Sequence, residues 1–411
     1  MKPLQTVLMV LLSVVLTNET VAVLHDTDDP SIYSSAPTGE LAASGWEFQG
    51  QFNSYLGTPI APHHFITAKH IGGSVGHDFH YNGEVFNTIA KTDDPDSDLR
   101  LWEIDGTFEQ YAPLYNTSDE SGKNLVVFGR GVDRGAVVTN SIINDPPGSR
   151  PPEIQVITNG WKWGAYTYVQ RWGENAVSAT TTINGNPVLK ADWDTSASEH
   201  ECMLTDKDSG GAVFIEQNGV WKLAGINFAI GPSFTYSLSA DGSDSFNGSI
   251  LDFTGGVYAK AGELWVLQLP TQKSAFYSTR ISSRYSWITN NIPDFDSDVD
   301  GLPDHWENST GVSEPDEDPD KDGFSNYEEW ICDTDPNLEN SYLQLLAYTQ
   351  ATSLGFTSSA DRQYRIEYST NLLNPNWQTS IDWFEGSLSQ TVYAVATTGS
   401  NRYYRVQVKL R

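Results

Sequence analysis

The sequence predicts an all-β protein, and two regions carry the pattern. Between residues 46 and 292, short β-rich runs such as Asn124–Gly129 are separated by Gly, Pro, Asn and Asp, which is typical of a β-sandwich or a β-barrel. Residues 342–411 again alternate polar and apolar side chains, as in Tyr364–Tyr368, and roughly five or six short strands fit there as a small β-sandwich. Helical spacing is scarce before residues 282–292, where one helix is expected to close the first region.

The length of 411 residues is too great for one ordinary core and indicates about two or three domains. Changes in composition along the chain set the expected boundaries. We expect a signal peptide over residues 1–22, an N-terminal extension over 23–45, a β-rich domain over 46–292, an acidic connector over 293–340 and a small β-sandwich over 341–411.

The N-terminus has the features of a secretory signal peptide. Lys2 precedes an apolar run from Val7 to Leu16, and the small residues of Thr20–Ala22 suit a signal peptidase. The apolar run is too short to span a bilayer, and no later stretch approaches the necessary length. We therefore expect an exported protein, extracellular or periplasmic, whose mature chain begins near Val23.

The chain is strongly acidic, with a formal net charge of −29 at pH 7. A nucleic-acid partner is therefore not expected, because binding to nucleic acid needs a basic face that displaces counterions. Residues 293–340 hold 17 Asp and Glu and a single basic residue, Lys321, so this segment contributes −16 to the total charge. A block of this kind is usually a solvated linker, but here the acids recur at regular spacing.

Only Cys202 and Cys332 are present. An exported protein of this size can fold without disulfides. The two cysteines can pair or remain buried and free, and the sequence leaves both alternatives open.

Three short segments contain, in chain order, a histidine, an aspartate and a serine. They are Thr67–His70, Asp98–Leu101 and Lys207–Gly211. A serine hydroxyl attacks an amide only when an imidazole takes its proton and a carboxylate orients that imidazole, so His70, Asp98 and Ser209 have the residue types of a nucleophilic triad. Each alone has another explanation, namely a structural histidine, a capping aspartate and an Asp-Ser-Gly-Gly turn. Their joint occurrence in this order favours the triad.

The flanks of these residues resemble those of trypsin/chymotrypsin-like serine proteases. Gly57–His70 resembles the family's histidine strand and turn, Asp98–Leu101 its Asp-Ile-Ala-Leu segment, Lys207–Ala212 its Gly-Asp-Ser-Gly-Gly-Pro loop, and Tyr277–Ile292 its closing strand and helix. The resemblance covers residues 46–292 and implies a double β-barrel with the triad in the cleft. It implies that His70 acts as general base and then general acid, that Asp98 fixes its tautomer, and that Ser209 is the nucleophile.

The resemblance also implies an oxyanion hole made by the backbone N–H groups of Lys207 and Ser209. Lys207 stands where the family has glycine, so a conformation reserved for glycine would distort this turn. No Ile-Val-Gly-Gly start follows a basic residue, so the family's activation, in which a new amino terminus pairs with the Asp beside the serine, is not indicated. Asp208 is then left without an identified partner.

We expect the residue before the cleaved bond to be apolar or small. By the resemblance, the floor of the substrate pocket is Met203, six residues before the serine, and its walls include Ile230 and Ala275. An uncharged cavity cannot compensate for the desolvation of a buried cation, so Arg and Lys are disfavoured at this position. Asp206 is a charge that could reverse this preference.

The acidic block contains two matches to a twelve-residue calcium loop, with acids at positions one, three, five and twelve and glycine at six. The two loops resemble dockerin and thrombospondin type-3 calcium repeats, which implies a calcium-ordered connector. Short helices are expected over Pro303–Asn308 and Ser325–Cys332, and a disordered acidic linker is the alternative. The expected ligands are Asp296, Asp298, Asp300, the Leu302 carbonyl, Asp304 and Glu307 in the first loop, and Asp318, Asp320, Asp322, the Phe324 carbonyl, Asn326 and Glu329 in the second.

The combined prediction is a secreted serine endopeptidase that hydrolyses a protein or peptide substrate through an acyl-enzyme intermediate. Calcium is expected to be structural, and catalysis is expected to need no cofactor. The C-terminal module is expected to bind a surface, a polymer or a neighbouring domain. The alternatives are a non-catalytic adhesion or scaffold protein on a degenerate protease fold and, more narrowly, an esterase that uses the same triad.

Overall fold

The computed structural model describes residues 23–25, 33–144, 153–194, 198–236, 244–298, 300–346, 353–395 and 402–410. The chain divides into two compact units, Met1–Ile292 and Pro293–Arg411. Within the described residues, no helix combines the length and the apolar character needed to cross a bilayer.

The first barrel of the N-terminal unit closes six strands around an aromatic core. The strands follow the order β2-β3-β4-β7-β6-β5 around the barrel. Their bounds are β2 Gly50–Phe52, β3 Tyr55–Ala61, β4 His64–Ala68, β5 Asp78–Tyr81, β6 Glu84–Asp93 and β7 Leu99–Ile104. Phe52, Phe65 and Trp102 are fully buried, and the ring of Phe65 stacks on that of Phe79 with centroids 3.9 Å apart. Burial of these large rings stabilises short strands that carry few residues each.

The second barrel has six strands in the order β11-β12-β20-β15-β14-β8. Their bounds are β8 Asn124–Gly129, β11 Arg171–Ile183, β12 Asn186–Asp192, β14 Ala212–Gln217, β15 Val220–Ala229 and β20 Ala275–Arg280. Val127, Leu189 and Val213 belong to its buried core. A 3-10 turn, η5 (Ser282–Arg284), and a helix, α1 (Tyr285–Asn290), follow β20. The predicted all-β fold with two barrels is therefore confirmed, and the closing helix lies where its spacing predicted it.

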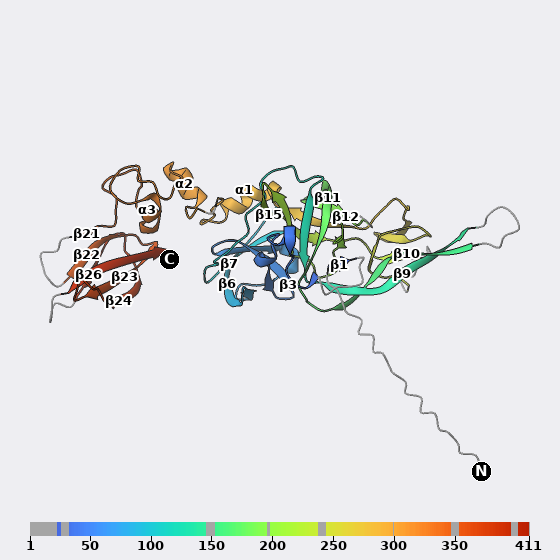
Figure 1. Ribbon diagram of the computed structural model, residues 1–411, viewed down its shortest axis with the longest axis horizontal. Coiled ribbons are helices and arrows are strands. Elements are labelled where there is room, and N and C mark those ends of the chain that lie inside the picture. The colour runs from blue at the N-terminus through green and yellow to red at the C-terminus, as the bar shows by residue number, and fades with distance from the viewer. Residues whose placement is uncertain are drawn as a thin grey trace, which may run out of the picture. The chain divides into compact units, whose positions relative to one another are not determined.

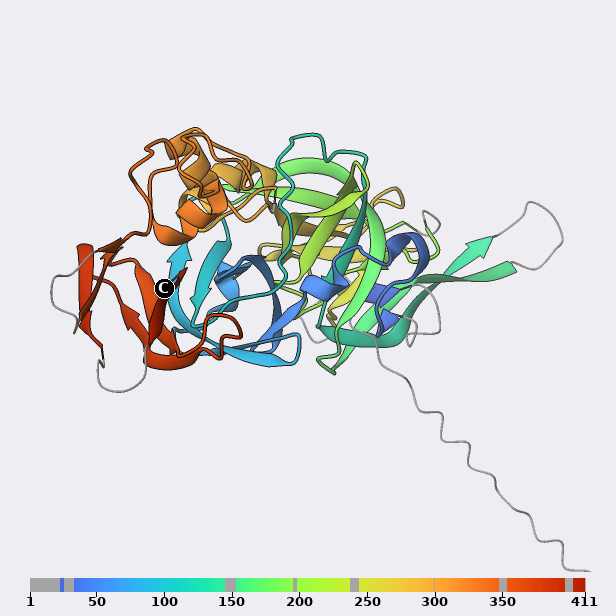
Figure 2. The same ribbon diagram turned by 60° about the vertical axis from the view of Figure 1, so that its left-hand side comes forward.

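Smaller elements extend the N-terminal unit. Figures 1 and 2 show that β9 and β10 leave the second barrel as a long ribbon. The sheets are β9 (Val132–Asn144), β10 (Glu153–Tyr166) and β17 (Gly248–Ile250); β16 (Phe234–Thr235), β18 (Tyr258–Ala261) and β19 (Leu264–Leu267); and β1 (Leu24–His25) with β13 (Cys202–Met203). Three 3-10 turns are η2 (Gly39–Leu41), η3 (Trp46–Phe48) and η4 (Lys69–Ile71).

The C-terminal unit begins with the two acidic loops, each followed by a short helix, α2 (Asp304–Thr310) and α3 (Asn326–Cys332). Two three-stranded sheets follow, in the orders β21-β22-β25 and β24-β23-β26. Their bounds are β21 Leu345–Leu346, β22 Ser353–Ser358, β23 Arg362–Ser369, β24 Gln378–Glu385, β25 Ser389–Ala394 and β26 Tyr403–Leu410. Phe356 of one sheet and Tyr364 and Ile366 of the other share a buried core, so the predicted C-terminal β domain is present.

The two cysteines are both free. Cys202 is buried in β13 of the N-terminal unit, and Cys332 is half-buried at the end of α3 in the C-terminal unit. Of the two alternatives that the sequence left open, the structure therefore shows the unpaired one.

Candidate functional site

His70 and Asp98 lie together at one end of the first barrel. His70 belongs to η4, which follows β4, and Asp98 directly precedes β7, the strand that pairs with β4. Oδ2 of Asp98 lies 2.5 Å from Nδ1 of His70, and Oδ1 accepts the backbone N–H of His70 at 3.0 Å. Because the carboxylate holds a proton on Nδ1, the Nε2 atom of the neutral ring is left as an acceptor.

Ser209 reaches His70 from the second barrel. It lies in the turn between β13 and β14, and its Oγ is 2.8 Å from Nε2 of His70. Phe228, in β15, places its ring edge-on to the His70 ring with centroids 5.9 Å apart. A continuous hydrogen-bonded chain thus runs from Asp98 through His70 to Ser209. This arrangement can transfer the serine proton to the imidazole.

Buried polar groups hold the turn that carries Ser209. The carboxylate of Asp208 accepts hydrogen bonds from the N–H groups of Gly131 and Thr205, each at 2.7 Å, and from Oγ1 of Thr205 at 2.9 Å. Burial raises the pKa of Asp208 to about 6. The side-chain amide of Asn227 donates to the carbonyl of Asp208 at 3.1 Å. Sequence reasoning identified none of these partners: Gly131 and Asn227 are distant in the chain, and nothing in the local pattern marks the nearby Thr205 as a donor.

Lys207 has an unusual backbone conformation for a residue with a side chain. Its φ is +73°, in the left-handed region, where a Cβ costs about 1–2 kcal/mol. Lysine thus occupies a conformation that glycine normally adopts. Within the described chain, the N–H groups of Lys207 and Ser209 have no acceptor, whereas the N–H of Asp208 between them faces the Thr205 carbonyl at 3.4 Å. Two free donors beside the serine hydroxyl fit the requirement of an oxyanion hole.

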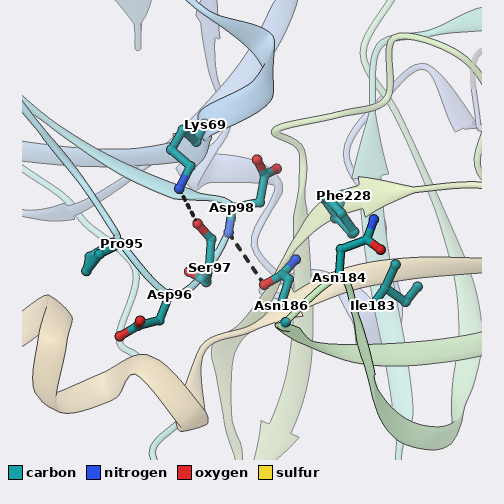
Figure 3. A pocket seen from close by; sticks show the side chains of 10 residues that line it. Lys69, Pro95, Asp96, Ser97, Asp98, Ile183, Asn184, Asn186 and Phe228 are labelled. Carbon is teal, nitrogen blue, oxygen red and sulfur yellow. Dashed lines mark hydrogen bonds between the residues drawn. The ribbon is translucent and has the colours of Figure 1, made fainter.

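A pocket of about 460 Å³ adjoins Asp98 and is lined by residues of both barrels (Figure 3). Lys69 fixes one wall, because its Nζ donates to the carbonyls of Asp94 and Ser97 at 2.6 and 2.5 Å. The N–H of Asp98 faces Oδ1 of Asn186 at 3.4 Å across the pocket. The lining residues are Lys69, Pro95, Asp96, Ser97, Asp98, Ile183, Asn184, Gly185, Asn186 and Phe228.

The three residues predicted to line the substrate pocket lie in or next to the core of the second barrel. Met203 is 1 % exposed and belongs to the buried cluster of that barrel, against which half-buried Ile230 packs. Ala275 begins β20 and is 6 % exposed. Met203 therefore lies within the core of the second barrel, and Ile230 packs against the same cluster.

The residue at the expected start of the mature chain is buried beside Asp208. Val23 is 0 % exposed, and the following β1 pairs antiparallel with β13, so that Leu24 lies opposite Met203. Val23 Cγ2 and Asp208 Oδ1 lie 2.8 and 2.2 Å from the point where a Cβ on Gly129 would sit, so the two side chains are neighbours. The sequence contained the signal for this contact, since the expected cleavage falls directly before Val23.

The two acidic loops have the same backbone design. In each, the carboxylate at position one accepts the N–H of the glycine at position six: Asp296 from Gly301 at 2.8 Å, and Asp318 from Gly323 at 3.0 Å. Both glycines have positive φ, +102° and +96°. One oxygen from each of Asp296, Asp298 and Asp300 lies within 4.8 Å of the others, and the same holds for Asp318, Asp320 and Asp322.

The second loop leaves buried oxygens without a hydrogen-bond partner. These atoms are Oδ2 of Asp320, Oδ2 of Asp322, Oδ1 of Asn326 and Oε2 of Glu329. Asn326 and Glu329 are at most 1 % exposed. Burial and the neighbouring carboxylates raise the pKa of Glu329 to about 7, and they raise that of Glu307 in the first loop to about 7. Unpaired, mutually repelling oxygens fit a hard cation such as Ca²⁺, which takes six or more oxygen ligands.

Comparisons with known proteins add little to this geometry. No family model matches the sequence, and no curated protein matches it. Among solved structures, the chain is similar to neuropsin, described as a serine protease expressed in the limbic system of mouse brain. The match has 12 % sequence identity and a TM-score of 0.36, and it covers 60 % of this chain and 95 % of that one. The functional interpretation therefore rests on the site itself.

Proposed function

We propose that the protein is a serine endopeptidase that acts after export. The observation that carries this proposal is the hydrogen-bonded chain from Asp98 through His70 Nδ1 and Nε2 to Ser209 Oγ, with contacts of 2.5 and 2.8 Å. A structural histidine needs no serine at its second nitrogen, and a structural serine needs no imidazole. The joint arrangement, with two free N–H donors beside the hydroxyl, serves acyl transfer.

In the proposed reaction, Ser209 Oγ attacks the carbonyl carbon of the scissile amide while its proton passes to Nε2 of His70. The developing oxyanion accepts hydrogen bonds from the N–H groups of Lys207 and Ser209, each worth roughly 3 kcal/mol. His70 then gives its proton to the leaving amine, the C–N bond breaks, and an ester remains on Ser209. A water molecule deprotonated by His70 hydrolyses that ester and restores both residues.

Specificity for an apolar or small residue before the cut belongs to the same proposal. The residues assigned to the pocket, Met203, Ile230 and Ala275, are all uncharged, and the half-buried Ile230 is the most exposed of the three. The carboxylate of Asp206, the charge that could oppose this, already accepts a hydrogen bond from the Tyr166 hydroxyl at 2.7 Å. A substrate guanidinium or ammonium would lose its hydration there without gaining a partner.

The position of Val23 supports activation by export. Removal of a signal peptide after residue 22 would leave an α-ammonium on Val23. The side chain of Val23 is already a neighbour of the Asp208 carboxylate beside Gly129. An ion pair between the two would stabilise the buried carboxylate and, through Asp208, the turn that holds Ser209. No separate activation peptide is then needed.

A calcium-ordered connector is the second proposed function. The orphaned oxygens of Asp320, Asp322, Asn326 and Glu329 support a bound cation in the second loop. The first loop has the same glycine-to-aspartate hydrogen bond as the second loop. The residues that would hold the ions are those named from the sequence in each loop. Bound calcium would neutralise the crowded carboxylates and stiffen the segment between the two β domains.

The C-terminal β domain is proposed to bind a surface or a polymer. Two tryptophan rings, that of Trp383 in β24 and that of Trp377 directly before this strand, are each covered by a cation, with Arg405 4.4 Å from the Trp377 ring and Lys409 4.5 Å from the Trp383 ring. Flat rings bordered by hydrogen-bond donors suit an extended ligand.

A fluorophosphonate probe tests the peptidase proposal against the non-catalytic scaffold. The wild-type protein is expected to be labelled on Ser209 and to hydrolyse a fluorogenic peptide library. Ser209→Ala and His70→Ala should lose labelling and turnover by several powers of ten while unfolding at a similar temperature. Absence of labelling in folded wild-type protein would favour the scaffold, and hydrolysis of esters without hydrolysis of peptides would favour the esterase.

A further inference from the structure

Lys207 carries the backbone strain nearest to the nucleophile. Its φ of +73° lies in a region that disfavours any residue with a Cβ, and it lies two positions before Ser209. Its N–H is also one of the two free donors assigned to the oxyanion hole. Relaxation of Lys207 to a negative φ would reorient that N–H, so some interaction has to oppose the relaxation.

The side chain of Lys207 is anchored to the opposite barrel. Its Nζ donates a hydrogen bond to the hydroxyl of Tyr55 at 2.9 Å and lies 5.2 Å from the centroid of the same ring. Tyr55 is the first residue of β3 in the first barrel. The hydrogen bond to Tyr55 raises the pKa of Lys207, which keeps it cationic. A charge-assisted hydrogen bond is among the stronger side-chain links.

The same strand also contacts the far side of the Ser209 turn. The carbonyl oxygen of Leu56, the residue after Tyr55, lies 2.7 Å from the point where a Cβ on Gly210 would sit. Gly210 has a φ of +81° and directly follows Ser209. The start of β3 therefore touches the turn both before and after the nucleophile, which places it well to set the geometry of the turn.

We propose that Lys207 and Tyr55 are positioning residues, and that their bond holds the Lys207 peptide in the left-handed conformation that keeps its N–H available to the oxyanion. This inference rests on the proposed peptidase function. The oxyanion forms only in the transition state, so the loss of the link lowers kcat and leaves KM nearly unchanged. Glycine at position 207 adopts the same φ without a side chain and therefore does not need the link.

A double-mutant cycle in the full-length protein tests this proposal. Tyr55→Phe keeps the ring and removes the hydroxyl, Lys207→Met removes the ammonium, and Lys207→Gly removes the strain. We expect each of the first two to lower kcat about tenfold with KM within about twofold, a smaller loss than removal of an oxyanion donor causes. Affinity for a peptide boronic acid, which forms a tetrahedral adduct on Ser209, should fall in parallel. In the Lys207→Gly background, Tyr55→Phe should have no effect on kcat.

Tyr81→Phe is the matched control, because it removes a tyrosine hydroxyl of the first barrel that donates to the Gln110 carbonyl and has no contact with Lys207. It should leave kcat unchanged. An equal loss from Tyr55→Phe with Lys or Gly at position 207, or wild-type kcat in Lys207→Met, would overturn the inference while fluorophosphonate labelling of wild type still supported the peptidase. Failure of the folded wild type to take the label would remove both proposals together.

Discussion

Both carboxylate oxygens of Asp98 bind His70: Oδ2 lies 2.5 Å from the ring Nδ1, and Oδ1 accepts the backbone N–H of His70 at 3.0 Å. This two-point contact fixes the main chain and the ring of His70 with one side chain. Asp98 is itself nearly buried and is held at its carbonyl by the N–H of Lys69 at 2.7 Å. The orientation of the imidazole toward Ser209 therefore follows from the position of Asp98.

Asp98→Asn is expected to lower kcat by about 10⁴-fold with little change in fold. An amide donates where the carboxylate accepted, so it favours the tautomer with a proton on Nε2 of His70, which cannot accept the serine proton. Steady-state kinetics on a peptide substrate measures the effect, with the unfolding temperature as the control for structure. A variant within tenfold of wild type would show that Asp98 does not set the tautomer.

Cleavage-site profiling on a peptide library should show a preference for apolar or small residues before the cut. The reason is that none of the residues assigned to the pocket, Met203, Ile230 and Ala275, carries a charge. Asp206→Asn should leave the profile unchanged, because Tyr166 already binds that carboxylate. A strong preference for Arg or Lys that disappears in Asp206→Asn would show that Asp206 enters the pocket.

The amino group of Val23 is expected to control activity. Mass spectrometry of the secreted protein should find Val23 as the first residue. A protein with one extra alanine before Val23 should have a kcat about 100-fold lower, because the displaced amino terminus no longer reaches Asp208. The turn that holds Ser209 then shifts, and a small misplacement of the reacting group lowers the rate strongly. The control is Val23→Ile, which keeps the amino group in place. Full activity with the extra alanine would reject this route of activation.

Glu201→Gln should stabilise the protein at alkaline pH. Burial raises the pKa of Glu201 to about 8, its Oε2 has no partner, and Oε1 accepts the N–H of Asp194 at 3.0 Å. The folded protein therefore keeps a proton that the unfolded chain releases near pH 4.5, so this carboxyl lowers stability increasingly from pH 4.5 to 8. In urea unfolding, the variant should gain about 2 kcal/mol or more at pH 8 and almost nothing at pH 4.5. The exposed Glu84→Gln is the control, and an equal gain at both pH values would contradict the explanation.

Calcium should protect the connector from proteolysis and raise its unfolding temperature. Calcium that binds only to the ordered form of the loops stabilises that form, and the gain in free energy of unfolding rises with the ratio of free calcium to the dissociation constant. With chelator, limited proteolysis should cut between residues 293 and 340, and Glu329→Gln should be cut even with calcium. Peptide hydrolysis should continue under both conditions, since the triad lies in the other unit. Equal resistance with calcium and with chelator would reject the ion sites.

The sequence by itself identified the candidate catalytic and calcium-binding residues. Each lies in a short segment whose neighbouring residues belong to the same motif. His70, Asp98 and Ser209 were identified together with their flanking residues. The acidic loops were identified by the spacing of their acids and glycine, and in each loop the N–H of that glycine, Gly301 or Gly323, donates to the first aspartate. Short β-rich runs between turn residues predicted the first β region, and alternation of polar and apolar residues predicted the second, for the same reason. Strand periodicity is a local property and survives without knowledge of the partner strand.

Only the tertiary structure decided how distant residues meet. Ser209 and His70 are 139 positions apart, and Lys207 and Tyr55 are 152 apart, so no window along the chain contains either pair. The same holds for Val23 beside Asp208, and for Met203, which lies opposite Leu24 of β1 and in the buried core of the second barrel. Closure of the two barrels determines these contacts, because burial of their cores fixes which loops face each other, and a local pattern contains no record of that packing.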